Sequence, residues 1–358
     1  MPTPRKGAII GFGFIAEGGH LPAYQSCEAL DIVAVADTCA ARREAAHRAL
    51  PSARIYENHE ILLVSEASRL DFVDVTTPPY AHASIARACL AANLHVLCEK
   101  PLATNASDAR SIIAAAKRAG RVVFPAHNYK HAPVVRAVRD VLSSGIIGPV
   151  RQVTMHTFRS THARGVAEWN EGWRLEKRYA GGGIAMDHGS HTFYLAFEWM
   201  GSLPTAISAT TWSEATEADT EDTFSAALTF PSGIANVHLT WRAGVRRVLY
   251  TLHGPRGSIR VEDDSVEVNT MDSPETPAET LWTSREQRVA SQWMDARHTA
   301  WFATTLDRFA GAMNGDGDAY ADAEEALRCV EVIEAAYASA EANGRTMSLR
   351  PRRAHEVA

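Results

Sequence analysis

The chain has 358 residues, of which 46% are hydrophobic and 22% are charged. This composition is typical of a folded globular protein, and the length exceeds what one hydrophobic core usually fills, so we expect two domains. The net charge of −6 at pH 7 argues against nucleic acid as a main partner. No apolar run approaches the roughly 18 residues of a membrane span, so we expect no membrane partner either.

The five cysteines are scattered and contain no C-x-x-C pair. An odd, scattered set favours reduced thiols over a disulfide framework or a zinc site. The N-terminal residues lead directly into a predicted strand and leave no room for a signal peptide. We therefore predict a cytoplasmic protein. The basic stretch at 350–353 is predicted to be solvated and not to bind a partner.

Strand-like and helix-like segments alternate through residues 1–125. Their order is strand, helix, strand, which indicates a doubly wound α/β fold with a parallel sheet. The predicted strands are 7–10, 31–37, 72–75, 95–98 and 121–124, and the predicted helices are 40–49, 80–92 and 107–119.

The pattern changes after residue 125. Apolar and polar residues now alternate with period two, which predicts antiparallel strands with one solvated face. We expect the first domain to span 1–125 and a second α/β domain to span 126–358. The predicted strands of the second domain are 150–157, 205–212, 223–230, 234–241, 247–253 and 258–261, with helices at 134–144 and 322–343.

A glycine turn follows the first predicted strand. Residues 11–16 read G-x-G-x-x-A, where Gly11 permits a tight turn and Gly13 lets the backbone approach a pyrophosphate. Phe14 and Ile15 begin a predicted helix, whose N-terminus offers N–H groups and a positive dipole end. The sequence therefore predicts a dinucleotide site at this turn, against the alternative of a merely structural turn.

An acidic residue, Asp37, ends the second predicted strand. A carboxylate there can accept hydrogen bonds from the ribose hydroxyls of the adenosine and would repel a 2′-phosphate. The three residues that follow include no arginine. We predict NAD as the cofactor in preference to NADP. The alternative is that Asp37 caps the next helix.

Two further motifs extend the pattern: Glu99-Lys100-Pro101 and the glycine-rich segment 181–191. With the glycine turn and Asp37, they resemble the glucose-fructose oxidoreductase and inositol dehydrogenase (Gfo/Idh/MocA) family over nearly the whole chain. The resemblance implies a Rossmann domain followed by an α/β domain with a large, open, mostly antiparallel sheet. It also implies that this sheet serves as an oligomer interface, so we expect a homodimer or homotetramer.

The resemblance also implies cofactor contacts. They lie in the turn, in the threonine/proline loop that follows residue 75, in the E-K-P motif and near residue 128. Lys130 is a mild departure, because members usually carry an arginine in the corresponding asparagine-x-arginine element. The expected cofactor residues are Gly11, Gly13, Phe14, Ile15, Asp37, Thr76, Thr77, Pro78, His82, Glu99, Lys100 and Asn128.

Three residues suit the removal of a hydride from an alcohol, and the resemblance implies the same three. Asp187 and His191 are four residues apart and share a face if the segment is helical. An unperturbed histidine pKa of about 6.5 suits a proton acceptor, and the carboxylate can orient the ring or bind a substrate hydroxyl. The Lys100 ammonium would stabilise alkoxide character on the reacting oxygen. His188 with His191 could be an H-x-x-H metal pair, but without a third ligand nearby we expect no metal.

The loop 158–165 and the stretch 169–174 are candidate walls of a substrate site, because an aromatic face with adjacent polar groups suits a sugar ring. The alternative is a surface loop with solvated arginines and packed tryptophans. The arginines favour an anionic sugar, and nearby glutamates offset this. The candidate substrate residues are Arg159, His162, Arg164, Trp173 and Arg174.

These observations predict an NAD-dependent oxidoreductase that transfers a hydride at a secondary alcohol of a sugar, cyclitol or aminosugar. One alternative is an NAD-dependent glycosidase that acts by transient oxidation and elimination and releases no net NADH. Another is a catalytically silent regulator that kept the fold and the cofactor. The presence of Lys100, Asp187 and His191 argues against the regulator, which needs no proton acceptor.

Overall fold

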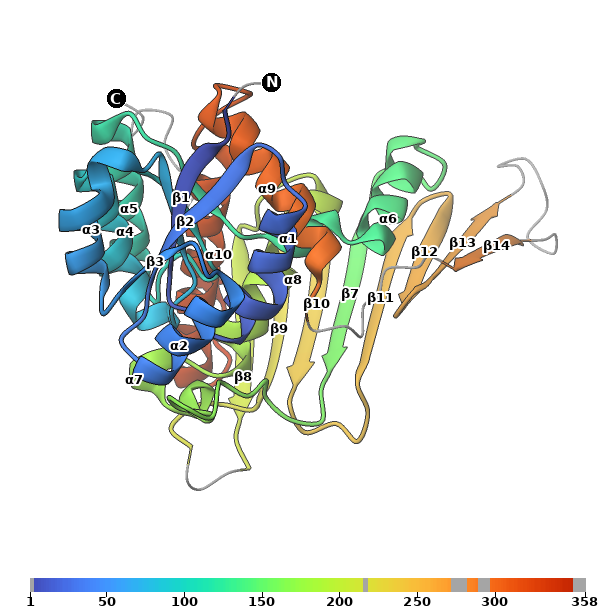
Figure 1. The fold of residues 1–358 in the computed structure, drawn as a ribbon. Helices are drawn as coiled ribbons and strands as arrows, with labels where there is room; N and C mark the ends of the chain where they lie inside the picture. Colours follow the sequence, from blue (N-terminus) through green and yellow to red (C-terminus); the bar gives the residue numbers. More distant parts are fainter. Residues whose placement is uncertain (1–2, 215–217, 272–281, 289–296, 350–358) are drawn as a thin grey trace. The chain divides into compact units, whose positions relative to one another are not determined.

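The computed structural model describes residues 3–214, 218–271, 282–288 and 297–349 (Figure 1). The basic stretch at 350–353 lies outside them. The chain divides into two compact units. The first unit comprises 1–131, 163–187 and 295–330, and the second comprises 132–162, 188–294 and 331–358.

These units do not follow one division of the chain at 125/126. The later stretch 295–330 joins the first unit because its apolar side chains complete the core: Phe302, Leu306 and Phe309 in one cluster, and Ala326 and Leu327 in another. Contiguous domains at 1–125 and 126–358 stay a prediction.

A six-stranded parallel sheet forms the centre of the first unit (Figure 1). Its strand order, β3-β2-β1-β4-β5-β6, is that of a Rossmann fold and confirms the predicted fold class. β3 is only three residues long, which explains why periodicity did not reveal it. The strands are β1 (Arg5–Ile10), β2 (Leu30–Ala36), β3 (Arg54–Tyr56), β4 (Phe72–Val75), β5 (His95–Cys98) and β6 (Val123–Pro125).

The helices of the first unit begin and end at local sequence signals. Asn58 and Asn105 accept hydrogen bonds from the backbone N–H groups of Ile61 and Asp108 at two helix N-termini, and Gly120 ends α5 at a φ of 60°. The helices are α1 (Leu21–Gln25), α2 (Ala40–Ala49), α3 (His59–Glu66), α4 (His82–Ala91), α5 (Ala106–Ala119), α7 (Lys177–Ala180) and α9 (Thr299–Met313), with a π-helical turn at Ala16–His20 before α1.

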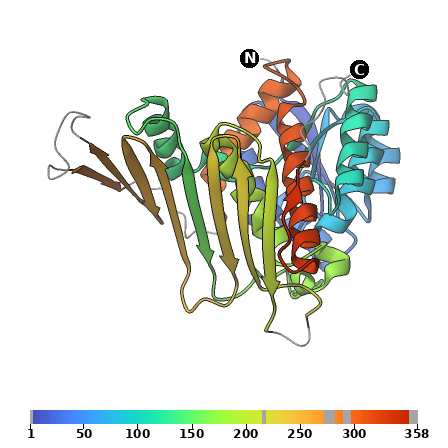
Figure 2. The ribbon, with the colours of Figure 1, turned by 180° about the vertical axis from the view of Figure 1, so that it is seen from behind.

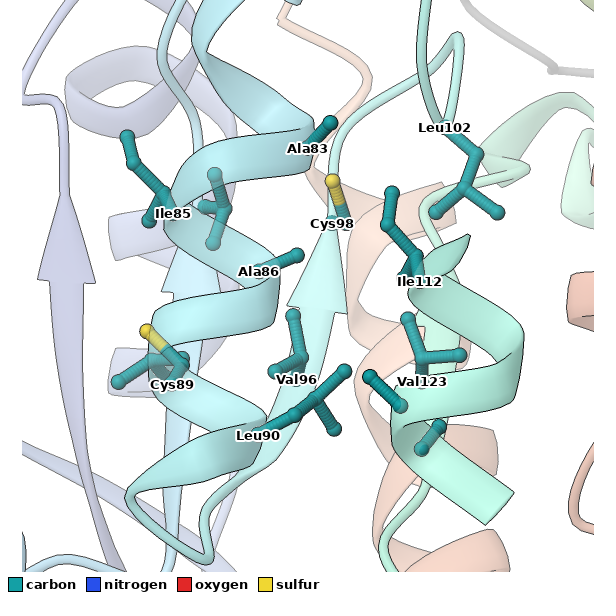
Figure 3. Packing of buried hydrophobic residues seen from close by; sticks show 14 of the residues in the cluster. Ala83, Ile85, Ala86, Cys89, Leu90, Val96, Cys98, Leu102, Ile112 and Val123 are labelled. Atoms are coloured by element: carbon teal, nitrogen blue, oxygen red, sulfur yellow. The ribbon is translucent and has the colours of Figure 1, made fainter. Parts of the chain in front are cut away.

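Small and branched side chains fill the space between the sheet and its helices. Figure 3 shows Ala83 and Ala86 of α4 and Ile112 of α5 against Val96 and Cys98 of β5. Alanines at these contacts let the helix backbones approach the sheet closely, and the branched residues fill what remains. The carboxyl ends of the strands are thereby held in fixed positions.

A nine-stranded, mostly antiparallel sheet forms the second unit within the described residues (Figure 2). Its strand order is β14-β13-β12-β11-β7-β10-β9-β8-β15, and the one parallel pair is β7 with β10. This confirms the predicted open sheet. The strands are β7 (Gln152–Phe158), β8 (Ala206–Trp212), β9 (Thr223–Phe230), β10 (Gly233–Thr240), β11 (Arg247–Gly254), β12 (Gly257–Glu262), β13 (Ser265–Met271), β14 (Trp282–Arg288) and β15 (Met347–Ser348).

Helices α6 (Pro133–Ser143), α8 (Ile184–Met200) and α10 (Ala321–Glu341) complete the described chain. The part of α8 that belongs to the second unit packs on the sheet: the ring centroid of Phe193 lies 6.4 Å from that of Phe224. Among the described residues, no helix is long and apolar enough to cross a membrane.

Close packing in the first unit gives a test of the fold. A Cβ added to Gly7 on β1 would lie 2.1 Å from the Phe72 ring, which is fully buried. We expect Gly7→Ala to lower the free energy of unfolding by about 1–3 kcal/mol, measured by urea denaturation. Gly172→Ala is the control, because its Cβ would have no atom nearer than 3.8 Å. Equal stability of the two variants would contradict the packing described.

Candidate active site

The glycine turn between β1 and the π-helical turn has the geometry of a phosphate-binding turn. Gly11 has a φ of 93°, and a Cβ on it would lie 2.8 Å from Cγ2 of Thr77. Gly13 borders open space, because no atom lies within 4 Å of the place where its Cβ would be. The side chains of Phe14 and Ile15 are exposed and half-buried respectively, and their backbone starts the helix. The turn is therefore open to a ligand at Gly13.

Asp37 connects this turn to the start of α2. Its Oδ2 accepts a hydrogen bond from the N–H of Phe12 at 2.6 Å, and its Oδ1 accepts one from the N–H of Cys39 at 2.7 Å. The bond to Cys39, the residue before α2, is also what the helix-capping alternative expects. A carboxylate has about four acceptor positions, so both oxygens can still accept from ribose hydroxyls.

Two arginines of α2 support the turn, and sequence reasoning missed both. The buried Arg42 donates from Nε to the carbonyl oxygen of Phe12 at 2.8 Å. Arg43 donates to the carbonyl oxygens of Asp37 and Thr38, at 3.0 Å each. Their position five and six residues after the acidic residue is the only signal that the sequence carries.

The loop after β4 lies against the glycine turn. Thr76 donates from Oγ1 to the carbonyl oxygen of Gly11 at 2.5 Å, and Pro78 continues the loop. The Thr77 hydroxyl is buried and has no hydrogen-bond partner within the described chain. His82 connects this loop to the next one, because its two ring nitrogens lie 2.7 and 2.8 Å from the carbonyl oxygens of Thr77 and Pro101. Burial lowers the pKa of His82, although the hydrogen bonds to the two carbonyl oxygens act in the opposite direction.

The residues present fit a dinucleotide. The open space at Gly13, the unpartnered Thr77 hydroxyl and the carboxylate of Asp37 all come from loops at the carboxyl ends of β1, β4 and β2. That edge is where ligands bind in doubly wound sheets. A pyrophosphate would lie over the turn, and a ribose would be held by Asp37.

Lys100 and Asp187 form an ion pair in the first unit. Lys100 Nζ donates to Asp187 Oδ1 at 3.0 Å and to the carbonyl oxygen of Asp187 at 2.7 Å. Arg174 Nε also lies 3.4 Å from Asp187 Oδ1, and its guanidinium stacks 4.1 Å from the ring of Trp173. All three charged side chains are largely buried, with exposures of 14–20%. The structure thus brings together four residues that the sequence singled out.

Glu99 faces the interior of the first unit. Its Oε1 lies 3.0 Å from Nε2 of His20, and its Oε2 accepts from the N–H of Lys100 at 3.0 Å. Nδ1 of His20 lies 2.7 Å from Oδ2 of Asp74 on β4. Sequence reasoning did not select His20 or Asp74, since a lone histidine and a mid-strand aspartate carry no local signal.

His191 lies on α8, one turn after Asp187, in the second unit. Its Nδ1 is 2.7 Å from the hydroxyl of Tyr194, a contact that the H-x-x-Y spacing on a helix makes possible. The pairing of His191 with Asp187 stays a prediction. The ring centroids of His188 and His191 are 6.3 Å apart, and no group of three metal-ligating side chains occurs among residues that the structure describes.

Residues 128–131 form a 3₁₀ turn in the first unit, in which Asn128 is buried. Lys130 points to α10, with Nζ 2.5 Å from Glu325 Oε1 and 3.6 Å from Asp322 Oδ1. The lysine at this position therefore serves an ion pair with α10.

The candidate substrate residues fall in both units. In the second, the buried Arg159 donates to the carbonyl oxygens of Phe158 and Arg247, which ties the ends of β7 and β11 together. His162 lies there too, 5.8 Å from Trp241 between ring centroids.

In the first unit, Arg164 is highly exposed and lies 3.8 Å from Glu171. Trp173 and Arg174 lie beside Asp187, as described above. These two are the candidate substrate residues that the structure places next to a predicted catalytic residue.

The sequence matches two family models. Residues 5–127 match the oxidoreductase family with an NAD-binding Rossmann fold, and residues 139–349 match the C-terminal α/β domain of the same family. The chain belongs to the Gfo/Idh/MocA oxidoreductase family. Its first domain is thus an NAD-binding Rossmann domain, and the cofactor is NAD.

Similar proteins act on sugars by name. The chain is 29% identical over 358 residues to the D-apiose dehydrogenase of Paraburkholderia graminis, covering 96% of this chain and 90% of that protein. It is 29% identical to the 1,5-anhydro-D-fructose reductase of Ensifer adhaerens, covering 72% and 74%. The fold matches a levoglucosan dehydrogenase in complex with NADH, with a TM-score of 0.84 and 21% identity over 97% and 99% of the two chains. These relatives give no support to the glycosidase or the regulator.

Asp37 gives a test of the cofactor site. We expect the protein to bind NADH more tightly than NADPH, because the Asp37 carboxylate would face the 2′-phosphate. Asp37→Ala should narrow that preference, and titration by fluorescence measures both affinities. Asp31→Ala is the control, since Asp31 is an exposed acid at the start of the same strand. Equal or tighter binding of NADPH by the unmodified protein would reject the role of Asp37.

Proposed function

We propose that the protein is an NAD-dependent dehydrogenase that oxidises a secondary alcohol of a sugar, cyclitol or aminosugar. The observation that carries the proposal is the ion pair of Lys100 with Asp187, 3.0 Å between Nζ and Oδ1. Lys100 lies just beyond the carboxyl end of β5, where ligands bind in this type of sheet. A protein that only bound the cofactor would not need an ammonium held at this position.

Lys100 would polarise the reacting hydroxyl. An ammonium has three N–H donors, and two of them go to Asp187. The third can bind the substrate oxygen and stabilise the negative charge that develops as its proton leaves. Asp187, which Arg174 also binds, fixes the place of the ammonium. NAD, when bound, accepts the hydride.

His191 would accept the proton. Its Nδ1 lies against the Tyr194 hydroxyl, which orients the ring on α8. For Nε2 to act as the base, Nδ1 carries the hydrogen and donates it to the tyrosine oxygen. An ammonium cannot accept a proton, and an ordinary aspartate is a weak base at neutral pH, so the imidazole is the suitable group.

The substrate would be of sugar size. The names of the relatives support this class: D-apiose, 1,5-anhydro-D-fructose and levoglucosan are small polyhydroxylated molecules. Trp173 offers an aromatic face for a sugar ring, and the adjacent Arg174 offers donors for its hydroxyls. Because the guanidinium of Arg159 is bound to backbone carbonyls, we place Trp173 and Arg174 at the substrate in preference to it.

We also propose that the protein is cytoplasmic and forms a homodimer or homotetramer. All five cysteines are free thiols, as expected of a reducing compartment. One face of the sheet in the second unit is partly exposed. His156 and His238 lie on this face, 5.9 Å apart between ring centroids. A second copy could cover that face.

A screen of sugars, cyclitols and aminosugars for NADH formation tests the proposed reaction. On any substrate that it identifies, Lys100→Ala should lower kcat by about 10²-fold or more, because a transition-state contact is lost. NADH binding should survive. Lys117→Ala is the control, since Lys117 forms an exposed ion pair with Glu324 on the same domain. Normal turnover by Lys100→Ala would show that this lysine is not catalytic.

The pH profile tests the base. If His191 accepts the proton, kcat/KM for oxidation should rise with pH through an apparent pKa of about 6 to 8. His191→Asn, which keeps hydrogen bonding but loses basicity, should abolish that rise and cost about 10²- to 10⁴-fold in rate. His47→Asn, a change at an exposed histidine of α2, should leave the profile unchanged. A variant His191→Asn that only raised KM and kept the rise would point to Lys100 as the base.

A further inference from the structure

A histidine between two carboxylates is buried in the first unit, directly behind the E-K-P motif. His20 and Asp74 are fully buried and Glu99 nearly so. Nδ1 of His20 lies 2.7 Å from Asp74 Oδ2, and Nε2 lies 3.0 Å from Glu99 Oε1. The three residues come from the π-helical turn, from β4 and from the end of β5, so the cluster connects the cofactor turn with two strand ends.

The imidazole in this cluster is protonated. A neutral imidazole has one N–H and can donate to one carboxylate, whereas an imidazolium donates to both. Burial alone lowers the pKa of His20, but the charges and hydrogen bonds of Asp74 and Glu99 outweigh it and raise the pKa to about 10. Burial likewise raises the pKa of Glu99, and His20 with Lys100 outweighs it and lowers that pKa. The imidazolium therefore donates to both acidic side chains, from Nδ1 to Asp74 and from Nε2 to Glu99.

The other groups that face the imidazole do not replace this pairing. Tyr24 of α1 donates its hydroxyl to Asp74 Oδ2 at 3.0 Å, and the pKa of this tyrosine is raised by burial and by Asp74, so it stays neutral. The ring of Phe302 of α9 packs against the imidazole in a tilted arrangement, 4.2 Å between centroids. Cys98, before Glu99, has a pKa raised by burial and by the two carboxylates, so it stays a thiol.

Glu99 connects the His20 cluster to the backbone of Lys100. While Oε1 is held by His20, Oε2 accepts the backbone N–H of Lys100 at 3.0 Å. A rotation of the Glu99 carboxylate would release both bonds together. The backbone of Lys100 sets where its side chain begins, and Nζ must reach Asp187 from there.

The local chain geometry is adapted to bring His20 into the cluster. A π-helical turn spans Ala16–His20, and such turns are rare and frequently occur at functional sites. Gly19 lies tightly against α9, because a Cβ on it would be 2.9 Å from the Phe302 ring. Burying three charged groups is costly, and apolar residues of similar volume could fill the space. Apolar residues could not hold the N–H of Lys100.

We propose that His20 is a positioning residue: its imidazolium fixes the Glu99 carboxylate, which fixes the backbone of Lys100 and keeps its ammonium on Asp187. The proposal deepens the proposed function and rests on it where turnover is concerned. The position of Lys100 itself can be measured without any substrate.

The test compares His20→Gln and Glu99→Gln with Tyr24→Phe. The tyrosine variant removes a hydrogen bond to the opposite carboxylate, Asp74, and so perturbs the cluster without reaching Lys100. The first readout is the rate at which acetic anhydride acetylates Lys100, followed by peptide mass spectrometry. We expect His20→Gln and Glu99→Gln to raise that rate about tenfold or more, because the ammonium is no longer held in its ion pair. Tyr24→Phe should leave it unchanged.

The second readout is turnover on the substrate that the screen identifies. His20→Gln and Glu99→Gln should each lower kcat by about 10- to 100-fold, and His20→Gln should change the Kd of NADH by less than about twofold. The double variant should lower kcat no further than the less active of the two single variants, because both changes act through the same chain of contacts. Tyr24→Phe should lower thermal stability and keep kcat.

The outcomes separate the two proposals. Unchanged acetylation of Lys100 in folded His20→Gln, or an equal rise in Tyr24→Phe, would overturn the positioning role whatever the substrate. Additive losses of kcat in the double variant would overturn it as well. Faster acetylation without any detectable dehydrogenase activity in the unmodified protein would support the positioning role and count against the proposed function instead.

Discussion

The ion pair of Lys100 with Asp187 is the interaction on which the rest of the site depends. It connects the end of a parallel strand to the first turn of α8, two positions 87 residues apart in the chain. Asp187 lies in the first turn of α8, where the positive end of the helix dipole stabilises a carboxylate. Removing Asp187 would take the carboxylate away from two largely buried cations, Lys100 and Arg174, which is costly. The ion pair therefore holds two distant segments together and also places the ammonium.

At the cofactor end of the first unit, one carboxylate likewise has both a structural and a binding role. Asp37 shapes the glycine turn through the N–H of Phe12 and fixes the start of α2 through the N–H of Cys39. Its remaining acceptor positions are available to a ribose. Cofactor preference and turn geometry therefore share one carboxylate. A change that admitted a 2′-phosphate would also loosen the turn, unless Arg42 and Arg43, which bind the neighbouring carbonyls, held it.

Buried charges recur behind the strand ends of this unit. One cluster is His20 with Asp74 and Glu99. Another is His127 and Lys130 with Glu325, where burial lowers the pKa of His127. The first cluster ties the π-helical turn and the end of β5 to β4, and the second ties the 3₁₀ turn at 128–131 to α10. Such pairs add little net stability over apolar packing, but they allow few alternative arrangements of the loops that they hold. A site that must align a hydride donor and acceptor depends on that restriction.

The sequence by itself determined the elements with strong local patterns. The glycine turn, Asp37 and the period-two strands of the second unit are recognisable because turn chemistry and side-chain alternation act over a few residues. The sequence analysis missed the three-residue β3, and also α9, β13 and β14, because their local patterns are weaker. The fold class and the cofactor were within reach of local pattern and family resemblance together.

Only the tertiary structure decided which of the selected residues meet. His20 and Glu99 are 79 residues apart, and nothing near either of them in the sequence indicates the other. The structure likewise pairs Glu99 with His20, Lys130 with Glu325 of α10, and Arg159 with backbone carbonyls. Contacts of this kind depend on the order and packing of whole elements. The spacing of residues along one strand or helix does not contain that information.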